Sequence, residues 1–311
     1  AVVGLWASAA PLGSVWLGAW RAAIGFATGG VMVLGLAVAA QAAPLDKRTI
    51  AMTTSFVGVG LGILFGATMV PLLLEQSILA AWVGVATAGS LAALVARWGW
   101  ARLGRTEQPV PAVGSVQPRR GGFTWLAIVV ASFLFSFGIV PHTIYWFDYI
   151  ARDLGHGYWF AGLHWTGVGV FAILGPLFAA WLAGIAGTAF AIGLIYFAMT
   201  IGIGLPWVSH AVAALAVSTM IFGAQPAVST LLGARARDLG APADMPAMMR
   251  TIILSNGIGS AIGGVSVPML LSVTGSYEAL FLAGGIAFAV ATVLLAPAAL
   301  ASRSPPVSRL N

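Results

Sequence analysis

A histidine with aromatic neighbours at helical spacing is the first candidate for chemistry in this sequence. His142 follows Pro141, and Tyr145, Trp146 and Tyr149 come three, four and seven residues later. On an α-helix these spacings place the side chains on one face. Imidazole titrates near neutral pH, so His142 is a candidate proton site, and the rings could stack on a ring-bearing or sugar-like solute. An aromatic belt at a membrane surface is the alternative interpretation.

Two further groups flank this segment. Asp148 and Arg152 are four residues apart, a spacing that predicts an ion pair on a helix. The pair is either an exposed outer-loop pair or part of an outer gate or protonatable site in a cavity. His164 and Trp165 lie about two turns into a later helix, and for them too the alternatives are an exposed position or a site in a cavity. Because Pro141 removes a backbone donor, the helix is expected to break there.

Three more polar side chains lie within long apolar segments. Arg21 lies about one turn inside the outer end of its segment, where it either snorkels to the interface or faces a cavity or partner. Gln225 stands beside Pro226, and Asn256 opens a glycine-rich stretch. Both uncharged groups could bind a solute or bridge helices.

Catalysis finds little support. The chain has no cysteine, and its four histidines are scattered, with no H-E-x-x-H motif and no P-loop. We therefore expect no enzyme, no metal site, no cofactor and no nucleotide-driven pump.

The composition indicates which solvent surrounds these residues. Of 311 residues, 60% are hydrophobic and 7% are charged, against about 25% charged in soluble domains. The mean hydropathy is +0.99. Because lipid leaves backbone groups unsatisfied, apolar runs of about 20 residues predict membrane-spanning helices. We expect an apolar stub at 1–10 and helices at roughly 17–40, 50–73, 77–97, 123–147, 158–183, 185–206, 209–233, 247–273 and 276–301.

Basic residues indicate the orientation. With alternating helices, twelve of the fourteen fall on one side, and only Arg21 and Arg152 fall on the other. The twelve are Lys47, Arg48, Arg97, Arg102, Arg105, Arg119, Arg120, Arg235, Arg237, Arg250, Arg303 and Arg309. The positive-inside rule therefore places the central loop and the C-terminus in the cytoplasm. The net charge of +6 reflects topology, so we expect no nucleic-acid partner.

Spaced glycines predict close helix packing and an internal repeat. A pattern G-x-G-x-x-x-G-x-x-x-V-P occurs from residue 60 and again from residue 257, offset by 197 residues. That offset spans six helices, which predicts twelve in all, with the chain beginning within the third. The predicted packing positions are Gly25, Gly29, Gly58, Gly62, Gly66, Gly259 and Gly263. Their smooth faces serve either static packing or rocking of the bundles.

Three of these segments carry a resemblance to a known superfamily. The run from Trp20 to Gly30 resembles the fourth-helix motif of the major facilitator superfamily, and Gly58, Gly62, Gly66 and Pro71 resemble its fifth-helix glycine motif. The run from Pro141 to Gly155 is similar to the seventh helix of the YbfB/YjiJ-type branch. The loop near Gly184–Thr188 departs from the superfamily because it lacks the charged gating motif often found there.

The resemblance implies an all-α major facilitator fold with two six-helix bundles. We expect the C-terminal part of the N-terminal bundle at 1–97, a cytoplasmic linker at 98–122, the C-terminal six-helix bundle at 123–303 and a cytoplasmic tail at 304–311. It implies a monomeric secondary active transporter of a small solute in a bacterial inner membrane, working by alternating access, with protons as candidate coupling ion. A ten-helix drug/metabolite-type carrier and a non-transporting polytopic membrane protein are the alternatives.

Overall fold

The computed structural model describes residues 1–42, 48–102, 122–241 and 244–301, and these residues are almost entirely helical. The chain forms two compact units, Ala1–Ala112 and Val113–Asn311, which are described separately below. Most of the predicted linker and all of the predicted tail at 304–311 lie outside the described residues.

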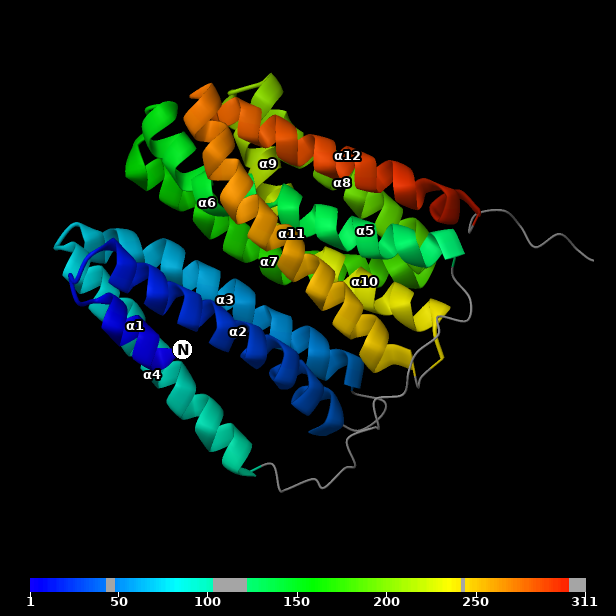
Figure 1. The fold of residues 1–311 in the computed structure, drawn as a ribbon, viewed down its shortest axis with the longest axis horizontal. Helices are drawn as coiled ribbons and strands as arrows, with labels where there is room; N and C mark the ends of the chain where they lie inside the picture. Colours follow the sequence, from blue (N-terminus) through cyan, green and yellow to red (C-terminus); the bar gives the residue numbers. More distant parts are fainter. Residues whose placement is uncertain (43–47, 103–121, 242–243, 302–311) are drawn as a thin grey trace, which may run out of the picture. The chain divides into compact units, whose positions relative to one another are not determined.

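Unit 1 contains α1 (Val2–Ser8), α2 (Ser14–Ala42), α3 (Arg48–Leu74) and α4 (Ile78–Arg102). The short helix α1 packs against α2 and α4, and α3 also contacts both of these helices (Figure 1). The Trp6 indole N–H donates to Ser90 Oγ at 3.0 Å, which ties α1 to α4. The expected stub and the three expected spans of this region are therefore present as helices.

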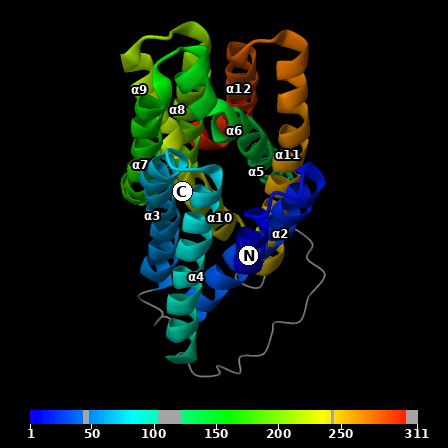
Figure 2. The ribbon, with the colours of Figure 1, turned by 90° about the vertical axis from the view of Figure 1, so that its left-hand side faces the viewer.

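Unit 2 contains the remaining helices, which cover the six expected spans of this region, two of them as broken helices. They are α5 (Gly122–Gly138), α6 (Val140–Asp148), the π-helix η2 (Tyr149–Asp153), α7 (Gly157–Ala186), α8 (Thr188–Val208), α9 (Val212–Gly223), α10 (Pro226–Leu239), α11 (Met245–Thr274) and α12 (Tyr277–Ala301). In Figure 2, α6 lies between α7–α9 on one side and α11–α12 on the other, and it contacts α7, α11 and α12.

Two spans of unit 2 are broken near their middle. The first breaks at Ile139, and Pro141 lies in the first turn of α6, where its missing N–H costs no helical hydrogen bond. The break expected at this proline is thus confirmed. The second break separates α9 from α10 at Ala224 and Gln225, with Pro226 opening α10. The prediction of one unbroken helix over 209–233 was therefore wrong, because Pro226 could not continue α9.

Close backbone contacts hold both breaks in place. A methyl group added to Gly284 of α12 would meet the Gly138 carbonyl oxygen, just before the first break, at 2.6 Å. One added to Gly175 of α7 would meet the Ala224 Cα, at the second break, at 2.7 Å. Only residues without side chains allow helices to approach this closely. Both breaks therefore lie where two helix backbones pack closely.

The predicted packing glycines behave in two ways. At Gly259 an added methyl would meet the Phe133 carbonyl oxygen at 2.3 Å, and at Gly263 it would meet Val140 at 2.7 Å, so both mediate contact of α11 with α5 and α6. At the other five it would meet no atom within 4 Å among the described residues: Gly25, Gly29, Gly58, Gly62 and Gly66. The packing predicted for these five is not seen there, since glycine spacing makes a smooth face without specifying a partner.

The helix bounds are also consistent with the predicted repeat. Adding 197 to the bounds of α2, α3 and α4 gives 211–239, 245–271 and 275–299. The observed counterparts are the α9–α10 pair at 212–239, α11 at 245–274 and α12 at 277–301. The repeat itself stays a prediction.

The helix surfaces are those of a membrane protein. In the described part of the chain, seven helical segments are long and apolar enough to cross a membrane. Large apolar side chains are exposed along them, including Val265 and Val293, each more than 70% exposed. Such continuous apolar surface is unfavourable in water and favourable in lipid.

Candidate functional site

A cluster of polar side chains lies buried where α6, α7 and α9 meet. Its members are His142 and Trp146 of α6, His164 of α7, and Ser218 and Thr219 of α9, here called the two-histidine cluster. Each is buried, with His164 the most exposed at 8%. Buried polar groups in an apolar bundle are costly unless they are paired, so their partners matter.

Hydrogen bonds to two neighbouring hydroxyl groups join the cluster. His142 Nε2 lies 2.8 Å from Ser218 Oγ. His164 Nδ1 lies 2.6 Å from Thr219 Oγ1, and the Trp146 indole N–H donates to the same oxygen at 3.2 Å. Two consecutive residues of α9 therefore hold one histidine each, from two different helices.

Aromatic rings enclose His142. Its imidazole stacks on Trp146 with centroids 4.6 Å apart and an interplanar angle of 25°. Phe222 of α9 lies 5.0 Å away and Phe281 of α12 lies 4.8 Å away. Because His142 and Trp146 are four residues apart, one face of α6 supplies both stacked rings. This enclosure keeps water from the imidazole.

One nitrogen of His142 is left without a partner. Nδ1 is buried and makes no hydrogen bond in the described structure. Whichever tautomer is present, a charged imidazolium carries hydrogen on both nitrogens. The hydrogen on Nδ1 would then be buried without an acceptor, so a charged His142 requires a different arrangement of α6 and its neighbours.

A second polar network lies at the end of unit 2 formed by η2, the α8–α9 turn and the α11–α12 turn, here called the η2 end. The expected ion pair is confirmed, with Arg152 Nη1 3.0 Å from Asp148 Oδ1. The Tyr277 hydroxyl of α12 also donates to Asp148. His210 lies 3.5 Å from Glu278. Asp148 therefore ties α6 to α12, and its side chain is one-third exposed.

The other predicted residues of unit 2 lie apart from the two-histidine cluster. Tyr145 is half-buried and packs edge-on against Tyr277 at 5.9 Å. Gln225 is half-buried at the break before α10. Asn256 of α11 has a buried Oδ1 with no hydrogen-bond partner. In unit 1, Arg21 is exposed, with its guanidinium carbon 5.8 Å from the centre of the Trp82 ring of α4.

Sequence reasoning missed the residues that connect the cluster. Ser218 and Thr219 are the hydroxyl-bearing partners, and Phe281 closes the aromatic enclosure. The pair Ser218–Thr219 is the only polar dipeptide in the apolar run of α9, which reads VAALAVSTMIFG. That signal was available, but nothing in the sequence showed which helices it faces.

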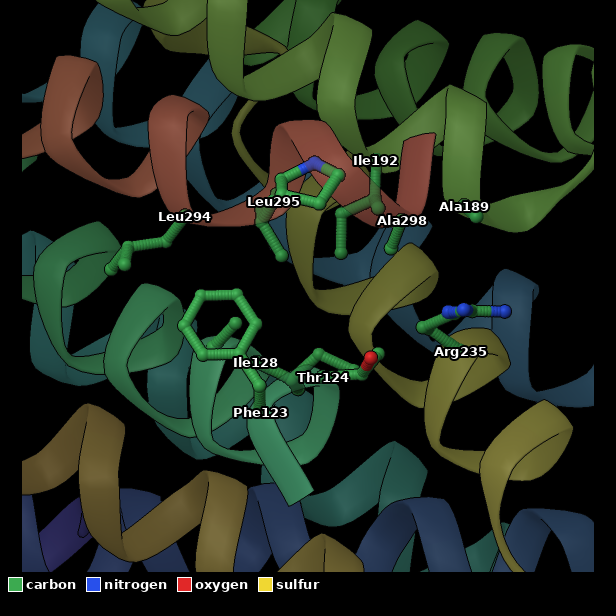
Figure 3. Close-up of a pocket in the computed structure, with 11 residues that line it drawn as sticks. Phe123, Thr124, Ile128, Ala189, Ile192, Arg235, Leu294, Leu295 and Ala298 are labelled. Atoms are coloured by element: carbon green, nitrogen blue, oxygen red, sulfur yellow. The ribbon is translucent and has the colours of Figure 1, made fainter. Parts of the chain in front are cut away.

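A small cavity lies at the opposite end of unit 2. Figure 3 shows it among apolar side chains of α5, α8 and α12, with Arg235 of α10 at its margin. Its volume of about 30 Å³ suffices for a water molecule or two. Pockets for organic ligands are about 300 Å³ or larger, so this cavity is not a solute site.

Comparison with known proteins identifies the class. The family model described as "Uncharacterised MFS-type transporter YbfB" matches residues 1–296. The chain therefore belongs to this family of the major facilitator superfamily, whose members are multi-pass membrane transporters. A search of the curated proteins found no match to the chain.

Proposed function

We propose that the protein is a secondary active transporter that moves a small solute across a bacterial inner membrane by alternating access, coupled to protons at His142. The observation that carries the proposal is the buried His142–Ser218 hydrogen bond. It joins α6 to α9, and each of these helices borders a break in its span. Broken helices in transporters commonly carry binding and gating elements.

The coupling follows from the hydrogen-bond inventory of His142. A charged ring does not fit this conformation, because its Nδ1 hydrogen would lack an acceptor. Binding or losing a proton must therefore shift the balance between conformations. Alternating access needs such a link between proton occupancy and the arrangement of the half-helices.

The remaining predicted residues have supporting roles in this proposal. The hydrogen bond from Tyr277 to Asp148 holds α12 against α6 at the η2 end. The positive-inside rule predicts that this end faces outward. Asn256, with its unpartnered oxygen, is a candidate solute contact. Arg21, Tyr145 and Gln225 stay candidates for the substrate or proton pathway. We expect a monomer without a cofactor.

Proton coupling can be tested with the full chain in proteoliposomes that contain a pH-sensitive dye. A solute library is screened for counterflow, and transported solutes are then tested for a solute-dependent pH change. The His142→Gln variant keeps a donor at the Nε2 position for Ser218 but cannot titrate, so we expect it to lose the pH change. The matched control is His210→Gln, at an exposed histidine outside the cluster.

The outcomes separate the alternatives. A solute that moves without any pH change in the parent protein would refute proton coupling. A pH change that His142→Gln leaves intact would refute the assignment to His142. Complete absence of counterflow across the library would favour the non-transporting alternative, provided that a thermal unfolding experiment shows the reconstituted protein to be folded. The family assignment removes the ten-helix drug/metabolite alternative.

A further inference from the structure

Three aromatic residues of α7 and its N-terminus lead from the η2 end to the two-histidine cluster. His156, Phe160 and His164 are spaced by four residues, so they share one helix face. The Phe160 ring lies 4.9 Å from each imidazole, centroid to centroid. His156 is exposed, Phe160 is half-buried and His164 is buried. This row therefore runs from the surface into the bundle.

The row continues across α9 to His142. His164 is hydrogen-bonded to Thr219, the preceding residue Ser218 is hydrogen-bonded to His142, and all four side chains are buried. Titratable and hydroxyl-bearing side chains thus lie along this row from His156 to His142, with the two hydrogen-bonded pairs joined through the adjacent residues Thr219 and Ser218 of α9. Phe160 is the one member of the series that can neither donate nor accept a hydrogen bond.

On the side of the two-histidine cluster that faces away from the η2 end, the helices pack closely. A methyl group added to Gly223, next to Phe222, would meet the Val168 carbonyl oxygen at 2.8 Å. One added to Gly138, four residues before His142, would meet the Phe288 ring at 2.8 Å. Contacts this close leave no room for water between these helices. Water is therefore excluded from the cluster on this side.

The electrostatic surroundings also differ along the row. The groups in contact with His142 in the described structure are uncharged: Trp146, Ser218, Phe222 and Phe281. His164 likewise contacts Trp146, Phe160 and Thr219. One group of charged and titratable side chains lies at the η2 end: Asp148, Tyr149, Arg152, Asp153, Tyr158, His210, Tyr277 and Glu278. Three carboxylates against one arginine attract cations to this end.

We propose that His142 and His164 form a single proton-binding site that is loaded from the η2 end through His156, with the Phe160 ring as the barrier on the route. The proposal rests on the proton coupling proposed above and adds the entry route, its direction and its gate. A hop between the two histidines of α7 needs hydrogen-bonded contacts of about 2.6–3.2 Å or a bridging water. Water can enter only when the Phe160 ring turns aside, so the motion of this ring limits loading.

Trp146 provides a direct readout that needs no solute. It stacks on His142, and an imidazolium in contact with an excited indole quenches its fluorescence. The chain has twelve tryptophans, so the Trp146 contribution is taken as the difference between the parent and Trp146→Phe. The full chain is reconstituted in vesicles of known orientation, and the external pH is dropped rapidly.

The variants separate route from site. We expect Phe160→Ala to speed the fluorescence change by at least about tenfold, equivalent to about 1.36 kcal/mol of barrier. His156→Gln should slow it. His164→Asn keeps a group that can bond Thr219 from the Nδ1 position but removes the titrating ring, so it should reduce the change. Each variant is paired with its own Trp146→Phe counterpart, and folding is checked by thermal unfolding.

The results distinguish two failures. If the Trp146 signal responds to pH and His142→Gln abolishes the response, but Phe160→Ala and His156→Gln leave its rate unchanged, protons enter elsewhere and only the route is wrong. A response to internal rather than external pH would overturn the direction. If the Trp146 signal never responds to pH, the proton site at His142 fails, and the coupling proposed above fails with it.

Discussion

Thr219→Val is the most informative single perturbation of the two-histidine cluster. Valine has nearly the shape of threonine and replaces only the hydroxyl group. That hydroxyl oxygen is bonded by His164 Nδ1 at 2.6 Å and by the Trp146 indole at 3.2 Å. Both partners are buried, so the substitution leaves two polar groups unpaired at once.

The expected loss follows from these two bonds. Hydrogen bonds between membrane helices contribute about 0.6 kcal/mol on average and about 1.7 kcal/mol at most. Unpaired buried groups in soluble proteins cost about 1–3 kcal/mol each. We therefore expect Thr219→Val to lower the free energy of unfolding by about 2 kcal/mol. For a unit of about 200 residues this corresponds to a fall in Tm of about 4–8 °C.

The assay is thermal unfolding of the purified chain in detergent, followed by size-exclusion chromatography. The matched control is Thr166→Val on α7, whose hydroxyl donates only to the Gly162 carbonyl of its own helix at 3.0 Å. That carbonyl keeps its helical partner, so the control should shift Tm by no more than about 1–2 °C. Equal Tm shifts for the two variants would contradict the hydrogen bonding at Thr219, because the Thr166 hydroxyl bonds only within its own helix.

Three further predictions concern other helices. Gly259→Ala should destabilise the protein, because its methyl group would clash with the Phe133 carbonyl oxygen of α5. The control Gly257→Ala, with open space around it, should leave the Tm within about 1 °C of the parent value. Equal effects of the two variants on Tm would contradict the α5–α11 contact. Asn256→Leu should leave the Tm unchanged or raise it, since it removes a buried oxygen that has no hydrogen-bond partner. The same variant should reduce solute counterflow. Unchanged counterflow would exclude Asn256 as a solute contact. Arg152→Gln should leave the Tm nearly unchanged, because its side chain is 67% exposed and solvent screens its ion pair with Asp148. A clear fall in Tm in thermal unfolding would contradict this.

Most of the helical layout could be predicted from the sequence. Long apolar runs must satisfy their own backbone hydrogen bonds in lipid, so the expected spans are helical in the described residues, two of them as pairs of shorter helices. The break near Pro141 was predictable because proline lacks an N–H. The break before Pro226 followed from the same chemistry and was not predicted.

The candidate site was predicted only in part. The sequence singled out His142, Trp146 and His164, which the structure brings together. It also singled out Asn256, which lies on α11 outside this cluster, and Arg21, which belongs to unit 1. Helical spacing relates residues within one helix and carries no information about the neighbouring helix. Ser218 and Thr219 were missed for this reason.

The sequence by itself determined the solvent, the helices and the local faces. These depend on hydropathy, on backbone hydrogen bonding and on the 3.6-residue repeat, all of which act over short stretches of chain. Only the tertiary structure decided that Ser218 and Thr219 of α9 each bind a histidine from a different helix. It also decided that glycines at 259 and 263 pack while those at 58, 62 and 66 meet no described atom. Such pairings depend on the crossing of helices far apart in sequence, which packing of whole surfaces selects.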